Sequence, residues 1–261
     1  MKIAYVGIDL LSKALFELRE NGCEIIKIFT CKTDNVTEFN VKIIDFARKN
    51  NIPYTLDRIT SEDIKGLNEQ GCDALICGGY YHLIPTDNDL PMVNIHPTLL
   101  PIGRGSWPMP IIIMNKYKKS GVTFHKMSER FDEGDIILQK EFELAVDENH
   151  QSYMEKVDKL IPDMISELTK NFIGLYDNAR LQTAGEYWEL PDKSMYTVNS
   201  DMDYEQVELI LRAFYGYECY YVNGDKTYEL IGAQVVRTKN VDGIYYPVKG
   251  GYIKSPIVKE I

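Results

Sequence analysis

The sequence lacks several features that would settle the class of protein at once. No apolar stretch approaches the roughly 18 residues of a membrane-spanning helix. Gly7 and Asp9 interrupt the apolar start of the chain, so we expect neither a membrane segment nor a secretory signal. The five cysteines are an odd number and none has CxxC spacing, which predicts reduced thiols in a cytoplasmic protein.

Positive charge is also scarce. The chain has 29 Lys and Arg against 39 Asp and Glu, a formal net charge of −10. This balance disfavours broad electrostatic binding to nucleic acid or to an anionic membrane, although a small anionic ligand is compatible with it. A full GxGxxG motif is missing, so a dinucleotide site is unsupported. No Cys/His cluster has zinc spacing, and we predict no metal site.

The first half of the chain alternates short apolar runs with amphipathic stretches. Strands are predicted at residues 2–6, 24–29, 73–78 and 92–96, and helices at residues 10–18, 39–46 and 61–70. This alternation predicts an α/β fold, a Rossmann-like, mostly parallel sheet with helices on both faces. Because ligands bind at the carboxyl ends of such strands, we expect the chemistry near residues 78 and 96.

The second half departs from this pattern. We predict a helix near 107–118, strands near 121–126 and 136–143, and a helix near 149–173 that Pro162 kinks or divides in two. Beyond Pro191 come one short helix and Tyr-rich strands with a hairpin at Asn223-Gly224. We therefore predict a catalytic domain at 1–190 and a small α+β subdomain at 191–261. The exposed aromatic strands at 217–258 predict a homodimer.

Polar side chains gather at the end of the strand at 92–96. Asn94 and His96 are two residues apart, so they project from the same side of the strand, which Pro97 then ends. An amide beside an imidazole suits a developing oxyanion. The tight acidic turn at 131–136 supplies a carboxylate to orient His96, but spacing alone does not choose among its acidic residues, Asp132, Glu133 and Asp135.

Four motifs follow one another along the chain: Asn94-x-His96-Pro-Thr-Leu-Leu-Pro101, Arg104-Gly105, Gly121-Val122-Thr123-x-His125-x-Met127 and Asp132-x-Gly134-Asp135-Ile136. In this order they resemble the folate-dependent formyltransferases, and the resemblance covers roughly the first 190 residues. It implies three catalytic residues, Asn94, His96 and Asp132. It also implies formyl transfer from N10-formyltetrahydrofolate, leaving tetrahydrofolate, through a tetrahedral intermediate.

The resemblance further implies where the two substrates bind. The folate is expected between the Leu-Leu-Pro loop and the aspartate loop, with cofactor contacts from Tyr80, His82, Leu83, Ile84, Pro85, Leu99, Leu100, Pro101, Arg130, Phe131 and Gly134. The acceptor is expected against the loop that contains Gly103, Arg104, Gly105 and Trp107.

Some of these residues also admit structural roles. Arg104 binds phosphate or holds its own loop in place, and Trp107 is better suited to packing than to recognition. His125 alternates with other strand residues, so we expect it to face away from the catalytic groups and to serve a supporting role.

The loop around Gly103 and Trp107 is similar to the sugar N-formyltransferase branch, and so are the stretches 186–191 and 212–218. This similarity implies a nucleotide-linked amino sugar as acceptor, such as a dTDP-linked 3- or 4-amino-dideoxy hexose for a surface polysaccharide like the O-antigen of lipopolysaccharide. Alternatives are methionyl-tRNA, glycinamide ribonucleotide, hydrolysis of the folate by water, or a non-catalytic binding module. Only about 70 residues remain after this region and the whole chain is acidic, which argues against tRNA, so we expect no nucleic-acid partner.

Overall fold

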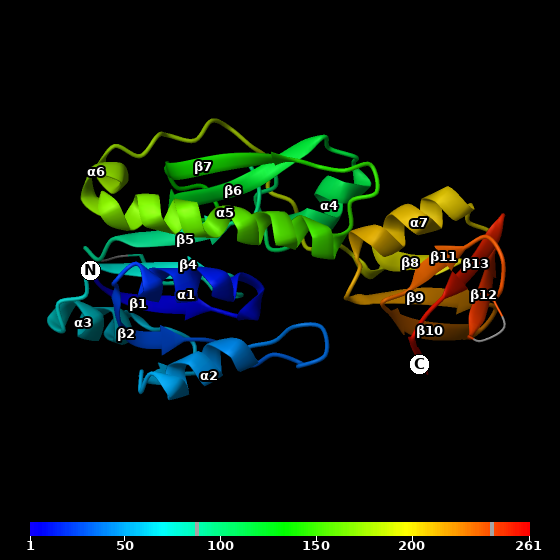
Figure 1. Cartoon of the computed structure of the whole chain (residues 1–261), viewed down its shortest axis with the longest axis horizontal. Coiled ribbons are helices and arrows are strands. Elements are labelled where there is room, and N and C mark those ends of the chain that lie inside the picture. Colours follow the sequence, from blue (N-terminus) through cyan, green and yellow to red (C-terminus); the bar gives the residue numbers. More distant parts are fainter. Residues whose placement is uncertain (87–88, 241–242) are drawn as a thin grey trace. The chain divides into compact units, whose positions relative to one another are not determined.

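The computed structural model describes residues 1–86, 89–240 and 243–261. It divides into two units, and Figure 1 labels most of their helices and strands. Unit 1 comprises Met1–Ser106, Gly121–Phe142 and Lys156–Trp188, and unit 2 comprises Trp107–Ser120, Glu143–Glu155 and Glu189–Ile261. The predicted boundary at 190 lies close to the passage from Trp188 to Glu189. Residues 107–120 and 143–155, which the prediction placed in the first domain, group with the second unit.

Unit 1 is built on a seven-stranded sheet with the spatial order β3-β2-β1-β4-β5-β6-β7. The first five strands in this order, β3, β2, β1, β4 and β5, are parallel to one another, and β6 is antiparallel to β5. The predicted mostly parallel α/β sheet is therefore confirmed, with one short strand, β3, that was not predicted. The bounds are β1 (Lys2–Gly7), β2 (Glu24–Phe29), β3 (Tyr54–Thr55), β4 (Ala74–Gly78), β5 (Met92–His96), β6 (Lys119–Lys126) and β7 (Ile136–Glu143).

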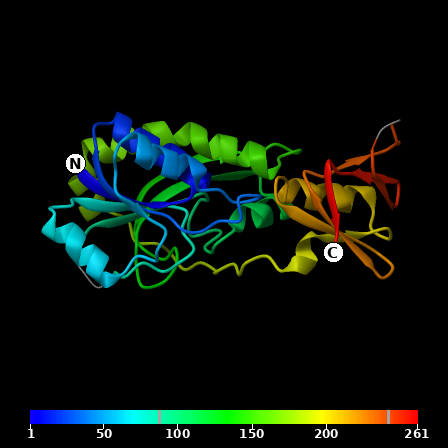
Figure 2. The ribbon, with the colours of Figure 1, turned by 90° about the horizontal axis from the view of Figure 1, so that it is seen from below.

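Helices cover both faces of this sheet, as Figure 2 shows. On one face lie α1 (Ser12–Glu20), which follows the 3₁₀ turn η1 (Asp9–Leu11), α2 (Val41–Lys49) and α5 (His150–Lys170), and on the other lies α3 (Ser61–Glu69). The short α6 (Phe172–Asp177) follows α5. Since α5 continues through Pro162, the predicted alternative of two abutting helices is wrong.

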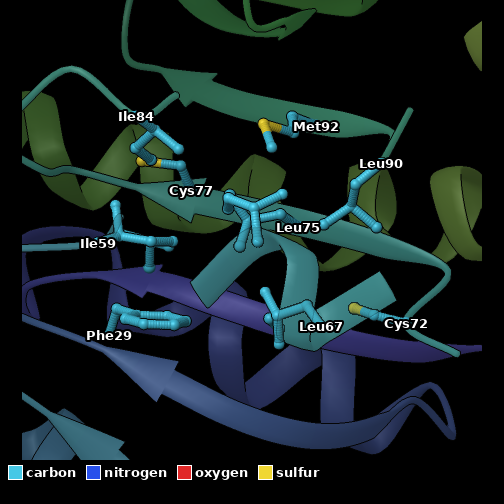
Figure 3. Packing of buried hydrophobic residues seen from close by; sticks show 12 residues of the cluster. Phe29, Ile59, Leu67, Cys72, Leu75, Cys77, Ile84, Leu90 and Met92 are labelled. Carbon is cyan, nitrogen blue, oxygen red and sulfur yellow. The ribbon is translucent and has the colours of Figure 1, made fainter. Parts of the chain in front are cut away.

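The core on the α3 face positions the site. Ile64 and Leu67 of α3 belong to one buried apolar cluster with side chains of four strands, namely Ala4, Val6, Phe29, Leu75, Cys77 and Met92. Figure 3 labels Leu67 and the side chains from β2, β4 and β5. Successive strand residues point to opposite faces of a sheet. Asn94 and His96, two and four residues after Met92, therefore lie on this same face, beyond the apolar cluster. All five cysteines are buried free thiols, as expected of small core residues.

Unit 2 contains α4 (Pro108–Met114), α7 (Tyr204–Ala213), the 3₁₀ turn η2 (Lys193–Tyr196) and two sheets. One has the order β14-β10-β9-β8 and the other β11-β13-β12. The strands are β8 (Thr197–Asn199), β9 (Glu218–Asn223), β10 (Lys226–Ile231), β11 (Gln234–Val236), β12 (Tyr245–Val248), β13 (Gly251–Lys254) and β14 (Ile257–Glu260).

Two predictions in unit 2 are decided by backbone conformation. The helix predicted to reach residue 118 ends at Met114, because Lys116 adopts a φ of 53°. The predicted hairpin is confirmed: Gly224, with a φ of 61°, begins the two-residue turn between β9 and β10. Residues 241–242 of the predicted Tyr-rich strands lie outside the described part. Among the described residues, no helix combines the length and apolarity needed to cross a bilayer.

Candidate active site

Asn94 and His96 occupy the carboxyl end of β5, as predicted. The neighbouring strand β6 runs antiparallel and places His125 directly opposite Asn94 and Thr123 opposite His96. Residues paired in this way share one face of a sheet, with their Cβ atoms about 5 Å apart. The prediction that His125 faces away from the catalytic groups is therefore wrong, because the cross-strand register brings its imidazole into the site.

Asp132 completes this cluster from the turn between β6 and β7. Its backbone is left-handed, with a φ of 58°. Oδ1 lies 3.2 Å from Asn94 Nδ2 and 3.4 Å from both His96 Nδ1 and His125 Nε2. Oδ2 accepts the backbone N–H of Gly105 at 2.9 Å. Of the three acidic residues in the turn, Asp132 is thus the one whose carboxylate meets Asn94 and His96.

The hydrogen bonds fix where the imidazole protons sit. His96 Nε2 lies 2.7 Å from the carbonyl oxygen of Gly103, which can only accept, so Nε2 carries the proton. His125 Nδ1 donates in the same way to the carbonyl of Lys126 at 2.8 Å. In the neutral rings, His96 Nδ1 and His125 Nε2 are therefore acceptors, and both face Asp132 Oδ1.

The side-chain nitrogen of Asn94 uses both of its hydrogens in this arrangement. Its Nδ2 donates to His125 Nε2 at 3.0 Å and to Asp132 Oδ1 at 3.2 Å. Both of its hydrogens are therefore used inside the cluster. Asn94 must release one of these bonds before it donates to an oxyanion, and His96 must likewise release the Gly103 carbonyl.

The surroundings of Asp132 favour its charged form, whereas those of His96 favour its neutral form. Burial by itself raises the pKa of Asp132, but His96, His125 and the Gly105 N–H favour the carboxylate and lower that pKa to about 2. Burial also lowers the pKa of His96 from its ordinary value, against the attraction of Asp132. At neutral pH, Asp132 is ionised and His96 is neutral. Among the described residues, no group of three or more His, Cys, Asp or Glu is arranged to hold a metal ion.

Arg104 staples its loop. Its guanidinium is buried and donates to the side-chain oxygen of Gln182 at 2.9 Å and to the carbonyls of Thr183 and Gly185 at 3.0 and 3.3 Å. Of the two roles open to Arg104 from sequence, the structure favours stapling over phosphate binding. Gly105 has a φ of 123°, and a Cβ there would lie 2.0 Å from the carbonyl oxygen of Trp188, so only glycine fits.

The residues predicted to contact the folate occupy three loops. Tyr80, His82, Leu83, Ile84 and Pro85 follow β4, Leu99, Leu100 and Pro101 follow β5, and Arg130, Phe131 and Gly134 surround Asp132. Leu83 and Phe131 are exposed, whereas Ile84 and Leu100 are buried. Leu100 donates its N–H to Thr123 and accepts from Gln139 through its carbonyl, so it holds the loop in place.

Trp107, predicted to bind substrate, belongs to unit 2. Its indole Nε1 donates to His150 Nε2 at 3.3 Å, and its ring packs 4.6 Å from Tyr217 and 5.3 Å from Phe214. These contacts favour the packing interpretation of Trp107.

Sequence reasoning missed two features of the site. One is that the side chain of His125 points into it. The other is Gln182, whose side chain binds the Asp132 turn. A prediction that β6 pairs antiparallel with β5 would have indicated His125, but no pattern in the sequence indicated Gln182.

Comparison with known proteins relates this chain to formyltransferases. The formyl transferase family matches residues 7–169, more than half of the chain. A methionyl-tRNA formyltransferase from Ehrlichia ruminantium (strain Welgevonden) is 28% identical over 227 residues, which cover 80% of this chain and 72% of that enzyme.

Two solved structures show the same fold at low sequence identity. HypX from Aquifex aeolicus, in complex with tetrahydrofolic acid, has a TM-score of 0.74 at 17% identity, and the match covers 100% of this chain but 44% of HypX. WlaRD, a sugar 3N-formyl transferase solved in the presence of dTDP and 5-N-formyl-THF, has a TM-score of 0.63 at 18% identity, covering 98% of this chain and 97% of WlaRD. The chain therefore belongs to the formyl transferase family.

Proposed function

We propose that this formyltransferase moves a formyl group from N10-formyltetrahydrofolate to the primary amine of a nucleotide-linked amino sugar. The observation that carries the proposal is the carboxylate of Asp132, which lies within 3.4 Å of Asn94 and of the two imidazoles. This combination supplies hydrogen-bond donors for an oxyanion and acceptors for a proton. A binding module has no need of a buried carboxylate within 3.4 Å of two imidazoles.

The proposed reaction begins with attack of the neutral amine on the formyl carbon. A C–N bond forms, and the carbonyl electrons move to oxygen. Asn94 and His96 exchange their present partners to hydrogen-bond that oxyanion. The proton of the attacking nitrogen passes to the cluster at Asp132, directly or through water. The bond from carbon to N10 then breaks, N10 receives a proton from the same cluster, and tetrahydrofolate leaves.

The loops around the cluster support a folate as formyl donor. Leu83 and Phe131 expose large apolar side chains on loops at the carboxyl edge of the sheet, where a flat pterin is expected to bind. Tyr80 anchors the first of these loops, because its hydroxyl accepts the N–H of Ile59 at 3.3 Å. Gly134 keeps the aspartate turn close to β6, since a Cβ there would lie 1.9 Å from the carbonyl oxygen of Lys126.

For the acceptor, the sugar proposal is supported by the net charge of −10 and by the loop around Gly103. The second candidate is methionyl-tRNA, favoured by the similarity to the Ehrlichia enzyme. Binding to tRNA phosphates would release counterions and weaken strongly with salt, whereas a small acceptor would show little such dependence. The cytoplasmic location and the homodimer remain predictions.

A panel of acceptors tests the proposal. Purified protein is incubated with N10-formyltetrahydrofolate and, in separate reactions, with dTDP-linked 3-amino and 4-amino dideoxy hexoses, glycinamide ribonucleotide, methionyl-tRNA or no amine. We expect tetrahydrofolate release and a formylated product only with an amino sugar. Formylation of methionyl-tRNA alone would replace the sugar by tRNA. Release without any amine would indicate hydrolysis, and saturable folate binding without turnover would indicate a binding module.

A further inference from the structure

The segment 180–188, which has little regular secondary structure, is fastened to the site at both ends. Arg180 exchanges two backbone hydrogen bonds with Ile136, at 2.7 and 2.8 Å, where β7 begins. At the other end, the Trp188 N–H donates to the carbonyl of Arg104 at 2.7 Å. The segment therefore spans from the turn that contains Asp132 to the loop that contains Gly105.

Between these two ends, Gln182 satisfies every polar group of its side chain. Nε2 lies 2.9 Å from the Asp132 carbonyl oxygen and 2.6 Å from that of Gly134. Because carbonyl oxygens only accept, both amide hydrogens are donated to the turn. Oε1 accepts from Arg104 Nη2 at 2.9 Å and from Nε at 3.3 Å.

The side-chain amide of Gln182 binds two segments whose relative position determines where the Asp132 carboxylate lies: the turn that contains Asp132 and the loop that contains Arg104 and Gly105. Asp132 is held in a left-handed conformation, which a residue with a side chain rarely adopts without support from its surroundings. Gly105, next to Arg104, donates its N–H to Asp132 Oδ2 at 2.9 Å. Gln182 binds the backbone of the first and, through Arg104, the loop of the second.

We propose that Gln182 is a positioning residue for formyl transfer, whose amide locks the aspartate turn against the Arg104 loop so that the Asp132 carboxylate faces Asn94 and His96. The inference rests on the catalytic role proposed for Asp132. Gln182 touches neither substrate in this scheme and acts only through the backbone of the turn.

Two near-isosteric variants separate positioning from a merely structural role. Gln182→Glu keeps an acceptor for Arg104 but cannot donate to the carbonyls of Asp132 and Gly134. Gln182→Met loses both functions. The matched control is Gln70→Glu, which makes the same change at an exposed helix end where Gln70 donates to the Gly66 carbonyl at 2.9 Å.

Steady-state kinetics are measured with N10-formyltetrahydrofolate and the fastest acceptor of the panel, and affinity is measured separately with 5-formyltetrahydrofolate. We expect Gln182→Glu and Gln182→Met each to lower kcat about 10- to 100-fold, the range for a misplaced catalytic group. The affinity for 5-formyltetrahydrofolate and the melting temperature of Gln182→Glu should stay close to those of the wild type. Gln70→Glu should match the wild type in all three.

A kcat for Gln182→Glu within threefold of the wild type would overturn the inference. A drop in kcat no larger than the drop in the fraction of folded protein would overturn it as well. Should Gln182→Glu fold poorly, the same kcat criterion is applied to Gln182→Met. Asp132→Asn is assayed in parallel. If it remains active, the proposed role of Asp132 fails; if it is inactive while Gln182→Glu is normal, only the inference about Gln182 fails.

Discussion

His150, at the start of α5, should make the protein lose stability in mildly acidic solution. Its side chain is only 4% exposed, and burial lowers its pKa to about 4 from an ordinary 6.5. Nε2 accepts the indole N–H of Trp107, and the ring of Tyr217 lies 4.8 Å away. The folded state therefore holds His150 neutral at pH values where the unfolded chain has already bound a proton.

The difference between the folded and unfolded pKa values of His150 sets the direction and the size of the change in unfolding free energy with pH. Because the folded pKa is depressed, the stabilisation is complete above pH 6.5 and is lost as the pH falls toward 4. A shift of this size corresponds to about 3 kcal/mol over the whole window. Between pH 7.5 and 5.0, the loss attributable to His150 is about 2 kcal/mol.

Urea unfolding followed by tryptophan fluorescence measures this term when the wild type is compared with His150→Gln. The glutamine can accept the Trp107 N–H but does not titrate in this range. We expect the difference in unfolding free energy between the two proteins to shrink by about 2 kcal/mol from pH 7.5 to 5.0. A difference that stays constant across this range would refute the assignment of the acid sensitivity to His150.

Three further predictions concern other parts of the protein. His96→Asn should lower kcat by about two to four orders of magnitude with unfolding unchanged, measured as tetrahydrofolate release, and near-normal turnover would contradict its role. Gly66→Ala should stabilise the protein by about 0.5–1 kcal/mol, because a Cβ on α3 there meets nothing within 4 Å, whereas Gly105→Ala should destabilise it; urea midpoints test the pair. Light scattering should find a dimer, and a monomer at working concentration would remove that prediction.

The alternating half of the fold was predictable because each element carries its own periodic signal. The apolar runs of β1, β2, β4 and β5 and the spacing of α1 to α3 depend on neighbours a few residues apart. Asn94 and His96 were found for the same reason, since their shared face follows from one strand. The early end of α4 was missed, because nothing in its spacing showed that Lys116 would adopt a positive φ.

What could not be predicted depends on pairings between distant segments. The orientation of His125 is set by the antiparallel register of β6 on β5, which one strand's pattern does not contain. Gln182 lies in a segment without periodicity, and its side chain contacts carbonyls about fifty residues earlier and Arg104 still farther back in the sequence. The role of Arg104 was likewise decided by groups at 182–185.

The low pKa of Asp132 constrains how the proposed reaction moves its proton. A carboxylate with a pKa of about 2 is a weak base, so on its own it is a poor match for the proton of an attacking amine. Its Oδ1, however, lies 3.4 Å from Nδ1 of His96 and from Nε2 of His125, the ring nitrogens that do not donate to backbone carbonyls. In the proposed reaction, this cluster receives the proton, and the negative carboxylate stabilises an imidazole that becomes protonated. In the proposed reaction, Asp132 would therefore contribute mainly as a fixed charge that stabilises the cationic nitrogen of the transition state, and its placement by Gln182, Gly105 and Asn94 would matter more than its basicity.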